Sequence, residues 1–401
     1  ELRALYRYYY LYKTPKIKAY AEDKMGMPLD AYFKMAFFVY AIFAGNGRFH
    51  VKEDYFTPKR KSFDEVTKTA LDYLLSQISK PLPELKRLCK DYCSYDEDKL
   101  FGFFNDAPHV KYPLIKDKGG YFCTIPKYIT TALLDGLYYR LDIPNSGDPD
   151  VNKEFSENME NYLGLIFEHF LNGSKVKCRQ EITYDAGKRK TQRTSDWILW
   201  DDTDICFMDC KTKRISVRGK QAVTVDDEEI ERVVREKPYS SGRKKKEIDD
   251  VIPEGLTKDL IALGMGVGKV FVSYDDYKAG NVSDFPYMEG KTFHAVIVTL
   301  EESLSNTPGY KDRIIKVAQS YREFKNGHPE PIDEKTVKML SVKNIEECAC
   351  VIAKEGIGYY LEHHMDNQLM AQKYVKDKFL LDKCNEELIN PFLEELMQYY
   401  E

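Results

Sequence analysis

The sequence predicts a protein of mixed α and β structure, in the α+β or α/β class, with two domains. The first domain is expected to be mainly helical, because apolar residues recur at helical spacing through about the first 110 residues. The second is expected to contain a mixed central sheet flanked by helices. Two apolar runs, Trp197–Trp200 and Ile205–Met208, flank a turn-forming segment as in a β-hairpin. A further apolar run, Phe293–Leu300, is typical of a buried strand beside that hairpin.

Length and composition agree with this organisation. A chain of 401 residues favours two or three domains, and 43% hydrophobic with 31% charged residues is typical of a globular protein. No run approaches about 18 uncharged apolar residues, so we expect no membrane span. Nine cysteines are present, and the close pairs Cys89/Cys93 and Cys348/Cys350 lack a second pair at zinc-finger spacing. We therefore expect reduced thiols in a cytoplasmic protein rather than a zinc site.

The first domain is predicted to span residues 1–148. Its aromatic cluster Tyr6–Tyr10 could stack on nucleic-acid bases, but aromatic residues at helical spacing more often belong to a core or a subunit interface. Tyr112–Ile115 and Tyr121–Pro126 are predicted to be short strands joined by a glycine turn, and Ile129–Leu141 a helix. The Pro-, Gly- and Asp-rich segment Asp142–Asp150 is predicted to separate the domains.

The second domain is predicted to cover residues 149–401, with a helical extension at its C-terminal end. The hydrophobic pattern predicts its elements from the spacing of apolar residues and from turn signals. The predicted helices are Asn152–Leu171, Asp226–Glu236, Leu256–Leu263, Tyr359–Cys384 and Glu386–Tyr400, and the predicted strands besides those above are Val176–Tyr184 and, more weakly, Cys348–Ala353.

The segment Gly264–Lys269 has the glycine spacing that suggests a phosphate-binding loop. The match fails, however, because Leu263 occupies the first glycine position and Val270 stands where serine or threonine is needed. No buried strand is predicted before it. We therefore expect no nucleotide-binding loop at this position.

Two acidic residues frame the predicted hairpin. Asp196 stands before its first strand and Asp209 ends its second, so antiparallel pairing should make them neighbours. Because side chains alternate along a strand, Asp209 and Lys211 should share one face and Cys210 should lie on the other. Two carboxylates and a lysine would then meet at one edge of an apolar hairpin, an arrangement that can hold a hard divalent cation.

At these residues the sequence resembles the PD-(D/E)XK nuclease superfamily, whose fold is shared by many restriction and repair endonucleases. The matching elements are Asp196, the Asp209-Cys210-Lys211 triplet thirteen residues later, and an upstream helix carrying Glu168. Ser195 stands where the family name implies proline, a position at which proline is often replaced. The resemblance covers the segment Glu154–Arg214 well and the rest of the chain in outline.

The resemblance implies that residues 149–401 form a restriction-endonuclease-like domain. It further implies that Asp196, Asp209, the main-chain carbonyl of Cys210 and Glu168 bind Mg²⁺, for which Mn²⁺ can substitute. Lys211 would position or activate the attacking water. For Glu168 two alternatives stay open at this point, a solvated glutamate in the last turn of its helix and a further metal ligand.

Basic residues surround the predicted site although the net charge of the chain is −5. Residues 171–246 carry nineteen Lys and Arg against thirteen Asp and Glu. A locally positive face on an acidic protein fits a nucleic-acid groove. Short runs of basic residues are usually solvated loops, but beside a metal site they are candidate phosphate contacts. The candidates are Lys188, Arg189, Lys190, Arg193, Lys213 and Arg214.

These features predict a metal-dependent endonuclease that hydrolyses the phosphodiester bonds of DNA, with RNA left open as a substrate. The alternative is a catalytically silent nucleic-acid-binding or scaffold protein on the same fold. A homodimer and a protein partner bound through the N-terminal domain are further expectations. The resemblance suggests a bacterial restriction or anti-phage defence setting, which no individual residue supports.

Overall fold

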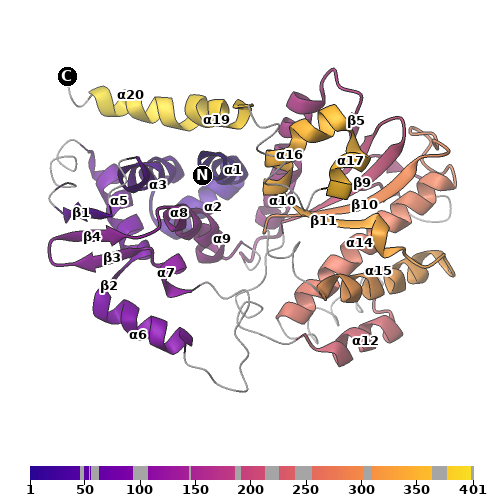
Figure 1. Cartoon of the computed structure of the whole chain (residues 1–401), viewed down its shortest axis with the longest axis horizontal. Helices are drawn as coiled ribbons and strands as arrows, with labels where there is room; N and C mark the ends of the chain where they lie inside the picture. The colour runs from indigo at the N-terminus through magenta and orange to yellow at the C-terminus, as the bar shows by residue number, and fades with distance from the viewer. Residues whose placement is uncertain are drawn as a thin grey trace. The chain divides into compact units, whose positions relative to one another are not determined.

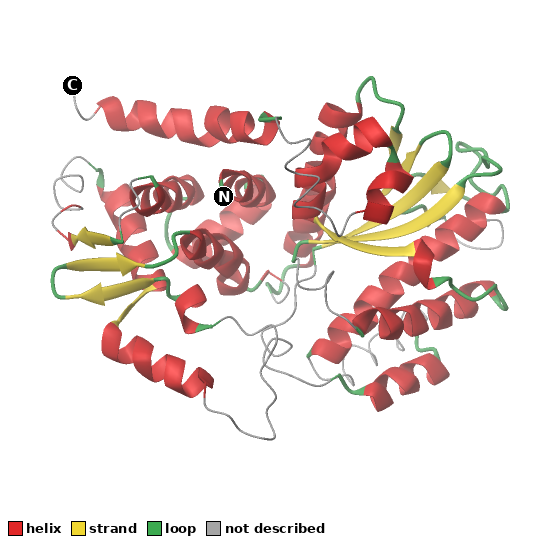
Figure 2. Ribbon diagram, viewed as in Figure 1, coloured by secondary structure: helices red, strands yellow, loops and turns green. Residues whose placement is uncertain are grey.

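The structure is a computed structural model (Figure 1). The structure describes residues 1–45, 49–53, 55, 63–93, 107–143, 146–185, 191–212, 225–239, 255–301, 309–363 and 377–398. It is a mixed α and β protein, as predicted, in which helices and strands both form extended parts of the chain (Figure 2). The chain divides into two compact units, each of which is described by itself.

The first unit comprises Glu1–Phe101, Asn105–Asn158 and Lys378–Glu401. Its helices up to Leu141 are α1 (Leu2–Tyr12), α2 (Pro15–Met25), α3 (Leu29–Ala44), α5 (Glu65–Ile78), α6 (Leu82–Cys93), α7 (Pro108–Lys111), α8 (Lys127–Thr130) and α9 (Gly136–Leu141). A π-helical turn joins α8 to α9, so the predicted helix over Ile129–Leu141 is confirmed as a bent helical segment. The side chains of Tyr6, Tyr8 and Tyr12 are buried, which favours the core role for the aromatic residues of α1.

A four-stranded sheet accompanies these helices. Its strands are β1 (His50–Lys52), β2 (Ser79–Pro81), β3 (Leu114–Asp117) and β4 (Gly120–Cys123), in the order β1-β4-β3-β2. The antiparallel β3–β4 pair turns at Gly119, whose φ of 91° favours glycine, so the hairpin predicted there is confirmed. The strands β1 and β2 were not predicted, because three residues are too few for a pattern to emerge.

The C-terminal helices group with the first unit, whereas the sequence led us to expect an extension of the second domain. They are α19 (Phe379–Cys384), a π-helical turn over Asn385–Ile389, and α20 (Asn390–Gln398). Glu387 accepts a hydrogen bond from the Tyr6 hydroxyl at 3.0 Å and forms an ion pair with Lys13 at 3.1 Å. Buried Leu380 and Cys384 supply the apolar part of this contact. Contacts between residues far apart in sequence thus decide to which unit these helices belong. Local sequence patterns do not reveal such contacts.

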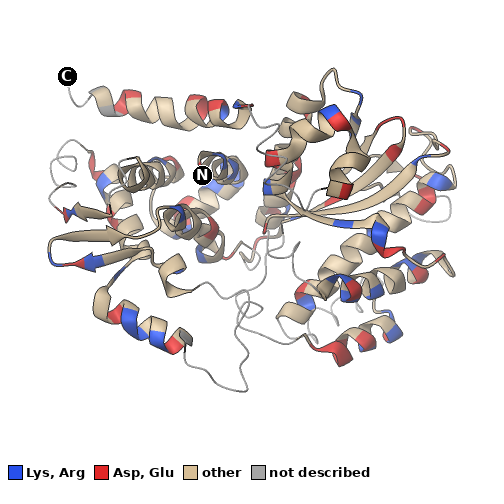
Figure 3. Cartoon of the chain, viewed as in Figure 1, with Lys and Arg blue, Asp and Glu red and all other residues tan. Residues whose placement is uncertain are grey.

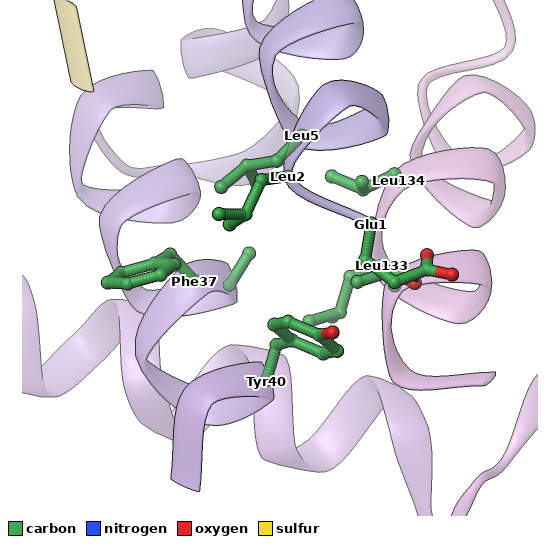
Figure 4. Close-up of a pocket in the computed structure, with 9 residues that line it drawn as sticks. Glu1, Leu2, Leu5, Phe37, Tyr40, Leu133 and Leu134 are labelled. Carbon is green, nitrogen blue, oxygen red and sulfur yellow. Dashed lines mark hydrogen bonds between the residues drawn. The ribbon is translucent and has the colours of Figure 1, made fainter. Parts of the chain in front are cut away.

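A small pocket in the first unit lies among α1, α3 and the π-helical turn after α8 (Figure 4). Its lining is mainly apolar, with Leu5, Phe37 and Leu134 around it. Glu1 contributes a carboxylate that accepts a hydrogen bond from Thr130 at 2.6 Å.

Among the described helices, none alone has the length and apolar composition for a membrane crossing, and only α2 with α3, bent by 71°, meet that test as a pair.

The second unit, Met159–Asp377 with Gly102–Phe104, is built on a five-stranded mixed sheet. The strands are β5 (Lys177–Gln180), β8 (Trp197–Trp200), β9 (Asp204–Lys211), β10 (Thr292–Thr299) and β11 (Val337–Ser341). Their order is β11-β10-β9-β8-β5. The strand β8 is antiparallel to both its neighbours, while β9, β10 and β11 run parallel to one another. The predicted hairpin and the buried strand beside it are therefore confirmed.

Helices cover both faces of this sheet (Figures 1 and 2). They are α10 (Pro149–Leu171), α12 (Asp227–Glu236), α14 (Leu256–Lys278), α15 (Tyr310–Asn326), α16 (Val342–Glu355) and α17 (Ile357–His363). On one face, Ile205 and Phe207 of β9 share a core with Leu260 of α14 and Ile314 of α15. On the other face, Trp197 packs edge-on against Phe167 of α10, with ring centroids 5.3 Å apart.

Glycines bring α14 close to α15. The run after Leu263 continues the helix rather than ending it, in agreement with the rejected phosphate-loop match. A Cβ atom on Gly264 would lie 2.8 Å from the Ile314 carbonyl oxygen, and one on Gly268 would lie 2.9 Å from that of Ala318. Glycine spacing of four residues therefore serves a close helix–helix contact.

Three secondary-structure predictions need correction. The helix predicted over Tyr359–Cys384 is not continuous, because Asp377 and Lys378, directly before α19, are not helical. Residues 348–353 lie inside α16 and not in a strand, because Ser341 and Asn344 form a reciprocal cap that starts a helix at Val342. The predicted strand Val176–Tyr184 is divided between β5 and β6 (Thr183–Tyr184), which pairs with β7 (Gln192–Arg193). The parts of the predicted C-terminal helices over residues 364–376 and 399–400 lie outside the described residues.

The turn between β8 and β9 is held by one buried side chain. Asp201 Oδ1 accepts hydrogen bonds from the backbone of Thr203 at 3.0 Å and of Asp204 at 2.9 Å. Its Oδ2 accepts a third from Ile357, at the start of α17, at 3.0 Å. Burial raises the pKa of Asp201, but these backbone hydrogen bonds outweigh burial and lower it. The turn thus also caps a helix 156 residues later.

We expect Asp201→Ala to lower the free energy of unfolding by about 3 kcal/mol, because several buried N–H groups lose their acceptor. Urea unfolding monitored by circular dichroism measures this. Asp202→Ala in the same turn, at an exposed position, should be nearly neutral. Equal effects of the two substitutions would contradict the role assigned to Asp201.

Candidate functional site

The carboxyl end of β9 and the start of β8 form the candidate site. Trp197 pairs with Met208, so the next pair outward places Asp196 opposite Asp209. The backbone N–H of Cys210 donates a hydrogen bond to Asp196 Oδ2 at 2.5 Å. The structure therefore brings Asp196 to the segment that carries Asp209, as the antiparallel pattern predicts.

Lys211 lies on the same side of β9 as Asp209, and its ammonium group forms an ion pair with Asp209 Oδ2. Asp209 is only 7% exposed, so this carboxylate is buried rather than standing at an exposed edge. Among the described residues, the Lys211 ammonium group is the partner of this Oδ2 atom. The Cys210 thiol is also buried, and its burial and the nearby carboxylates raise its pKa well above the ordinary value.

The two carboxyl groups of the site outnumber its one ammonium group. Burial and the charge of Asp209 raise the pKa of Asp196 to about 8, while Lys211 acts in the opposite direction. Burial lowers the pKa of Lys211, but the carboxylates of Asp209 and Asp196 outweigh it and raise that pKa to about 12. One lysine therefore faces two carboxylates, and a cation placed between them would relieve the unfavourable burial of charge.

The acidic residue of α10 near this site is Glu160 rather than Glu168. The charge of Glu160 raises the pKa of both Asp196 and Cys210, and its backbone oxygen accepts a hydrogen bond from Trp197 Nε1 at 3.2 Å. Glu168 is exposed, and its charge acts on Cys178 of β5. Eight residues of helix separate the two glutamates by about 12 Å along the axis. This is a correction to the sequence-based choice of Glu168.

A second acidic neighbour, Glu181, lies where the β5 strand ends. Its backbone N–H donates to the Asp196 carbonyl at 2.8 Å, so it continues the pairing of β5 with β8. Burial raises the pKa of Glu181, and the charge of Asp209 raises it further, while Arg193 lowers it. Glu181 follows β5 directly, at the point where the predicted strand Val176–Tyr184 is divided.

Of the predicted phosphate-contacting residues, only Arg193 lies in the described part of the chain. Its guanidinium is largely exposed and contacts Glu181 Oε1 at 3.2 Å. Lys188, Arg189, Lys190, Lys213 and Arg214 lie outside the described residues. Arg193 therefore contacts an acidic residue whose pKa the charge of Asp209 raises.

The residues present fit a hard cation with an incomplete set of protein ligands. Across the described ranges, no three His, Cys, Asp or Glu side chains gather as a metal-binding group. Asp196 and Asp209 would therefore supply two carboxylates, and Cys210 its main-chain carbonyl. Mg²⁺ commonly retains several waters beside one or two carboxylates, so a pair of this kind is chemically sufficient.

No family model, curated protein or solved structure matches the chain. The interpretation of this site therefore depends on its residues and their geometry.

We expect the thermal stability of the metal-free protein to fall as the pH rises from 5 to 8. Asp196 has an ordinary pKa of 3.8 and a raised pKa of about 8 in the fold. Between these values the folded state holds a proton that the unfolded state has released, so stability decreases with pH. Differential scanning calorimetry in the presence of EDTA measures the slope.

Asp196→Asn should flatten this pH dependence, because the amide does not titrate. Asp202→Asn, at an exposed position in the same unit, should keep the wild-type slope. If Asp196→Asn also kept the wild-type slope, the electrostatic description of Asp196 would be wrong.

Proposed function

We propose that this protein is a metal-dependent nuclease that hydrolyses phosphodiester bonds, with DNA as the expected substrate. The observation that carries the proposal is the meeting of half-buried Asp196 and buried Asp209 with Lys211 at the end of a paired β-hairpin. A solvated surface cluster would not place one carboxylate fully and a second partly out of solvent beside a single ammonium group. The same three residues carry the resemblance to PD-(D/E)XK nucleases.

The arrangement of the second unit supports this proposal. The resemblance implies a mixed central sheet flanked by helices, and β8 and β9 stand at the centre of such a sheet. Ser195, at the position of the family's proline, has a buried hydroxyl that finds no hydrogen-bond partner among the described residues. Serine at this position is therefore compatible with the turn into β8 but is not explained by a contact.

Each residue of the site has a chemical role in the proposed reaction. Asp196, Asp209 and the Cys210 carbonyl would hold Mg²⁺ or Mn²⁺, and Glu160 would add negative charge from α10. When bound, the ion would supply activation of water and neutralisation of charge on the phosphate. Lys211, whose pKa is raised to about 12, stays protonated at neutral pH. It is therefore suited to donate a hydrogen bond to the water or to a phosphate oxygen, and not to act as a base.

Proximity to the site favours Arg193 over the cations of α12 and α15 as a contact for the phosphate backbone. The helix α12 begins with acidic residues and has its basic residues later, and α15 carries residues of both signs (Figure 3). Arg313 pairs with Asp227 at 2.6 Å and Lys316 with Glu231 at 2.7 Å, so these cations serve contacts between α12 and α15. Arg193 joins its basic run to the site itself through Glu181.

We expect Asp209→Asn and Lys211→Met to reduce Mg²⁺-dependent cleavage by about 100-fold or more, because each removes charge that acts at the reacting phosphate. Supercoiled, linear and single-stranded DNA and RNA should be tested with Mg²⁺ and with EDTA. Circular dichroism would show whether each variant remains folded. Wild-type activity in a folded Asp209→Asn variant would exclude the assignment.

A matched pair within α10 gives the control. Glu160→Gln should slow cleavage, and Glu168→Gln should leave it unchanged, because only the former carboxylate acts on Asp196. The reverse result would restore Glu168 as the relevant helix acid. A wild-type protein that binds DNA and fails to cleave it with either metal would favour the alternative, a catalytically silent nucleic-acid-binding protein.

We expect charge reversal at Lys188, Arg189, Lys190 and Arg193 to weaken DNA binding to a similar degree for all sequences. Each lost phosphate contact should reduce the slope of log affinity against log salt concentration by about one unit. Fluorescence anisotropy at several salt concentrations measures this. Reversal at Lys244, Lys245 and Lys246 serves as the comparison, and a larger loss from this second cluster would place the binding groove elsewhere.

A further inference from the structure

Helix α14 passes directly over the Asp209–Lys211 ion pair at a position without a side chain. A Cβ atom built on Gly266 would lie 3.0 Å from Lys211 Cε and 3.3 Å from Asp209 Oδ2. Both distances are shorter than an ordinary van der Waals contact. The space beside Gly266 is therefore occupied by the lysine chain and the carboxylate oxygen themselves.

The other two glycines of the run have a different surrounding. A Cβ atom on Gly264 would meet Val317 Cβ at 2.6 Å and the Ile314 carbonyl oxygen at 2.8 Å. Gly268 likewise faces α15. These two positions are explained by the packing of α14 on α15. Gly266 points to β9 instead, and helix packing does not account for it.

We propose that Gly266 is a positioning residue, which keeps the Lys211 ammonium group against Asp209 by leaving room for the lysine chain beneath α14. The proposal rests on the proposed function for its catalytic consequence, but its structural part concerns only Lys211 and Asp209. Any side chain at position 266 would displace the flexible end of Lys211, because the carboxylate is fixed on a buried strand. The ammonium group would then shift from its place beside Asp209.

Gly266→Ala separates this role from a general effect on folding. In the middle of a helix, alanine is favoured over glycine, and the clashing atom belongs to the movable part of a lysine. The gain in helix propensity offsets part of the loss from the weakened ion pair, so we expect a melting temperature closer to that of the wild type than the one that Gly264→Ala shows. We also expect kcat to fall at least tenfold with KM nearly unchanged, since the displaced group acts on the reaction and not on distant substrate contacts.

Gly264→Ala is the matched control, two residues away on the same helix. Its Cβ would meet the backbone of α15, which has no low-cost way to move. This variant should lower the melting temperature and leave kcat per folded molecule unchanged. A loss of activity in Gly264→Ala as large as that in Gly266→Ala, at temperatures where both are folded, would overturn the proposal.

A second readout does not depend on activity. In ¹H–¹⁵N NMR spectra of the lysine ammonium groups, an ammonium held in an ion pair and shielded from water gives a distinct signal, which Lys211→Met identifies by its absence. Gly266→Ala should shift or remove that signal, and Gly264→Ala should retain it. A wild-type signal in Gly266→Ala would overturn the positioning role. If the wild-type protein cleaves no nucleic acid, the proposed function fails, and the NMR comparison still decides the role of Gly266.

Discussion

The strand β9 is the constraint on which the second unit depends. It pairs with β8 on one side and β10 on the other, and every residue from Asp204 to Cys210 is buried. Ile205 and Phe207 project into the core beneath α14 and α15. The same alternation continues to Asp209 and Lys211, so the residues of the candidate site are placed by the register that builds the core. A shift of one residue would move both to the opposite face.

Burial makes the charged groups of this site costly in free energy. An unpaired carboxylate at the position of Asp209 would be costly, and loss of one member of a buried ion pair typically costs about 3–5 kcal/mol. The ion pair with Lys211 stabilises the Asp209 carboxylate, and the hydrogen bond from the backbone N–H of Cys210 stabilises that of Asp196. Glu160 and Glu181 work in the opposite direction. The protein thus maintains an electrostatically unfavourable cluster at the end of its central strand, which is more typical of a working site than of a structural contact.

Local patterns were sufficient for the hairpin, for β10 and for the side of β9 on which Lys211 lies, because alternation and turn signals are properties of the sequence itself. They were insufficient for the choice between Glu160 and Glu168. Helical periodicity tells which residues share a face, whereas the turn that reaches Asp196 depends on where α10 crosses β8. Gly164 decides that crossing, since a Cβ atom there would lie 2.8 Å from the Trp197 ring. Likewise, the C-terminal helices were assigned by proximity in sequence, and their partners in α1 lie more than 370 residues away.

The parallel pairing of β9 with β10 has a consequence for how the chain folds. Phe207 of β9 pairs with Ala295 of β10, which is synthesised 88 residues later. The strand β9, apolar on both faces, therefore lacks this partner until β10 has been made. The β8–β9 hairpin can close locally and bring Asp196 to Asp209 early, but its other edge stays open until α14 and β10 have left the ribosome. Long-range parallel pairing is slow, and open apolar edges favour association with other chains. The segment between Lys211 and Thr292 therefore sets the interval during which the nascent protein is most vulnerable to aggregation.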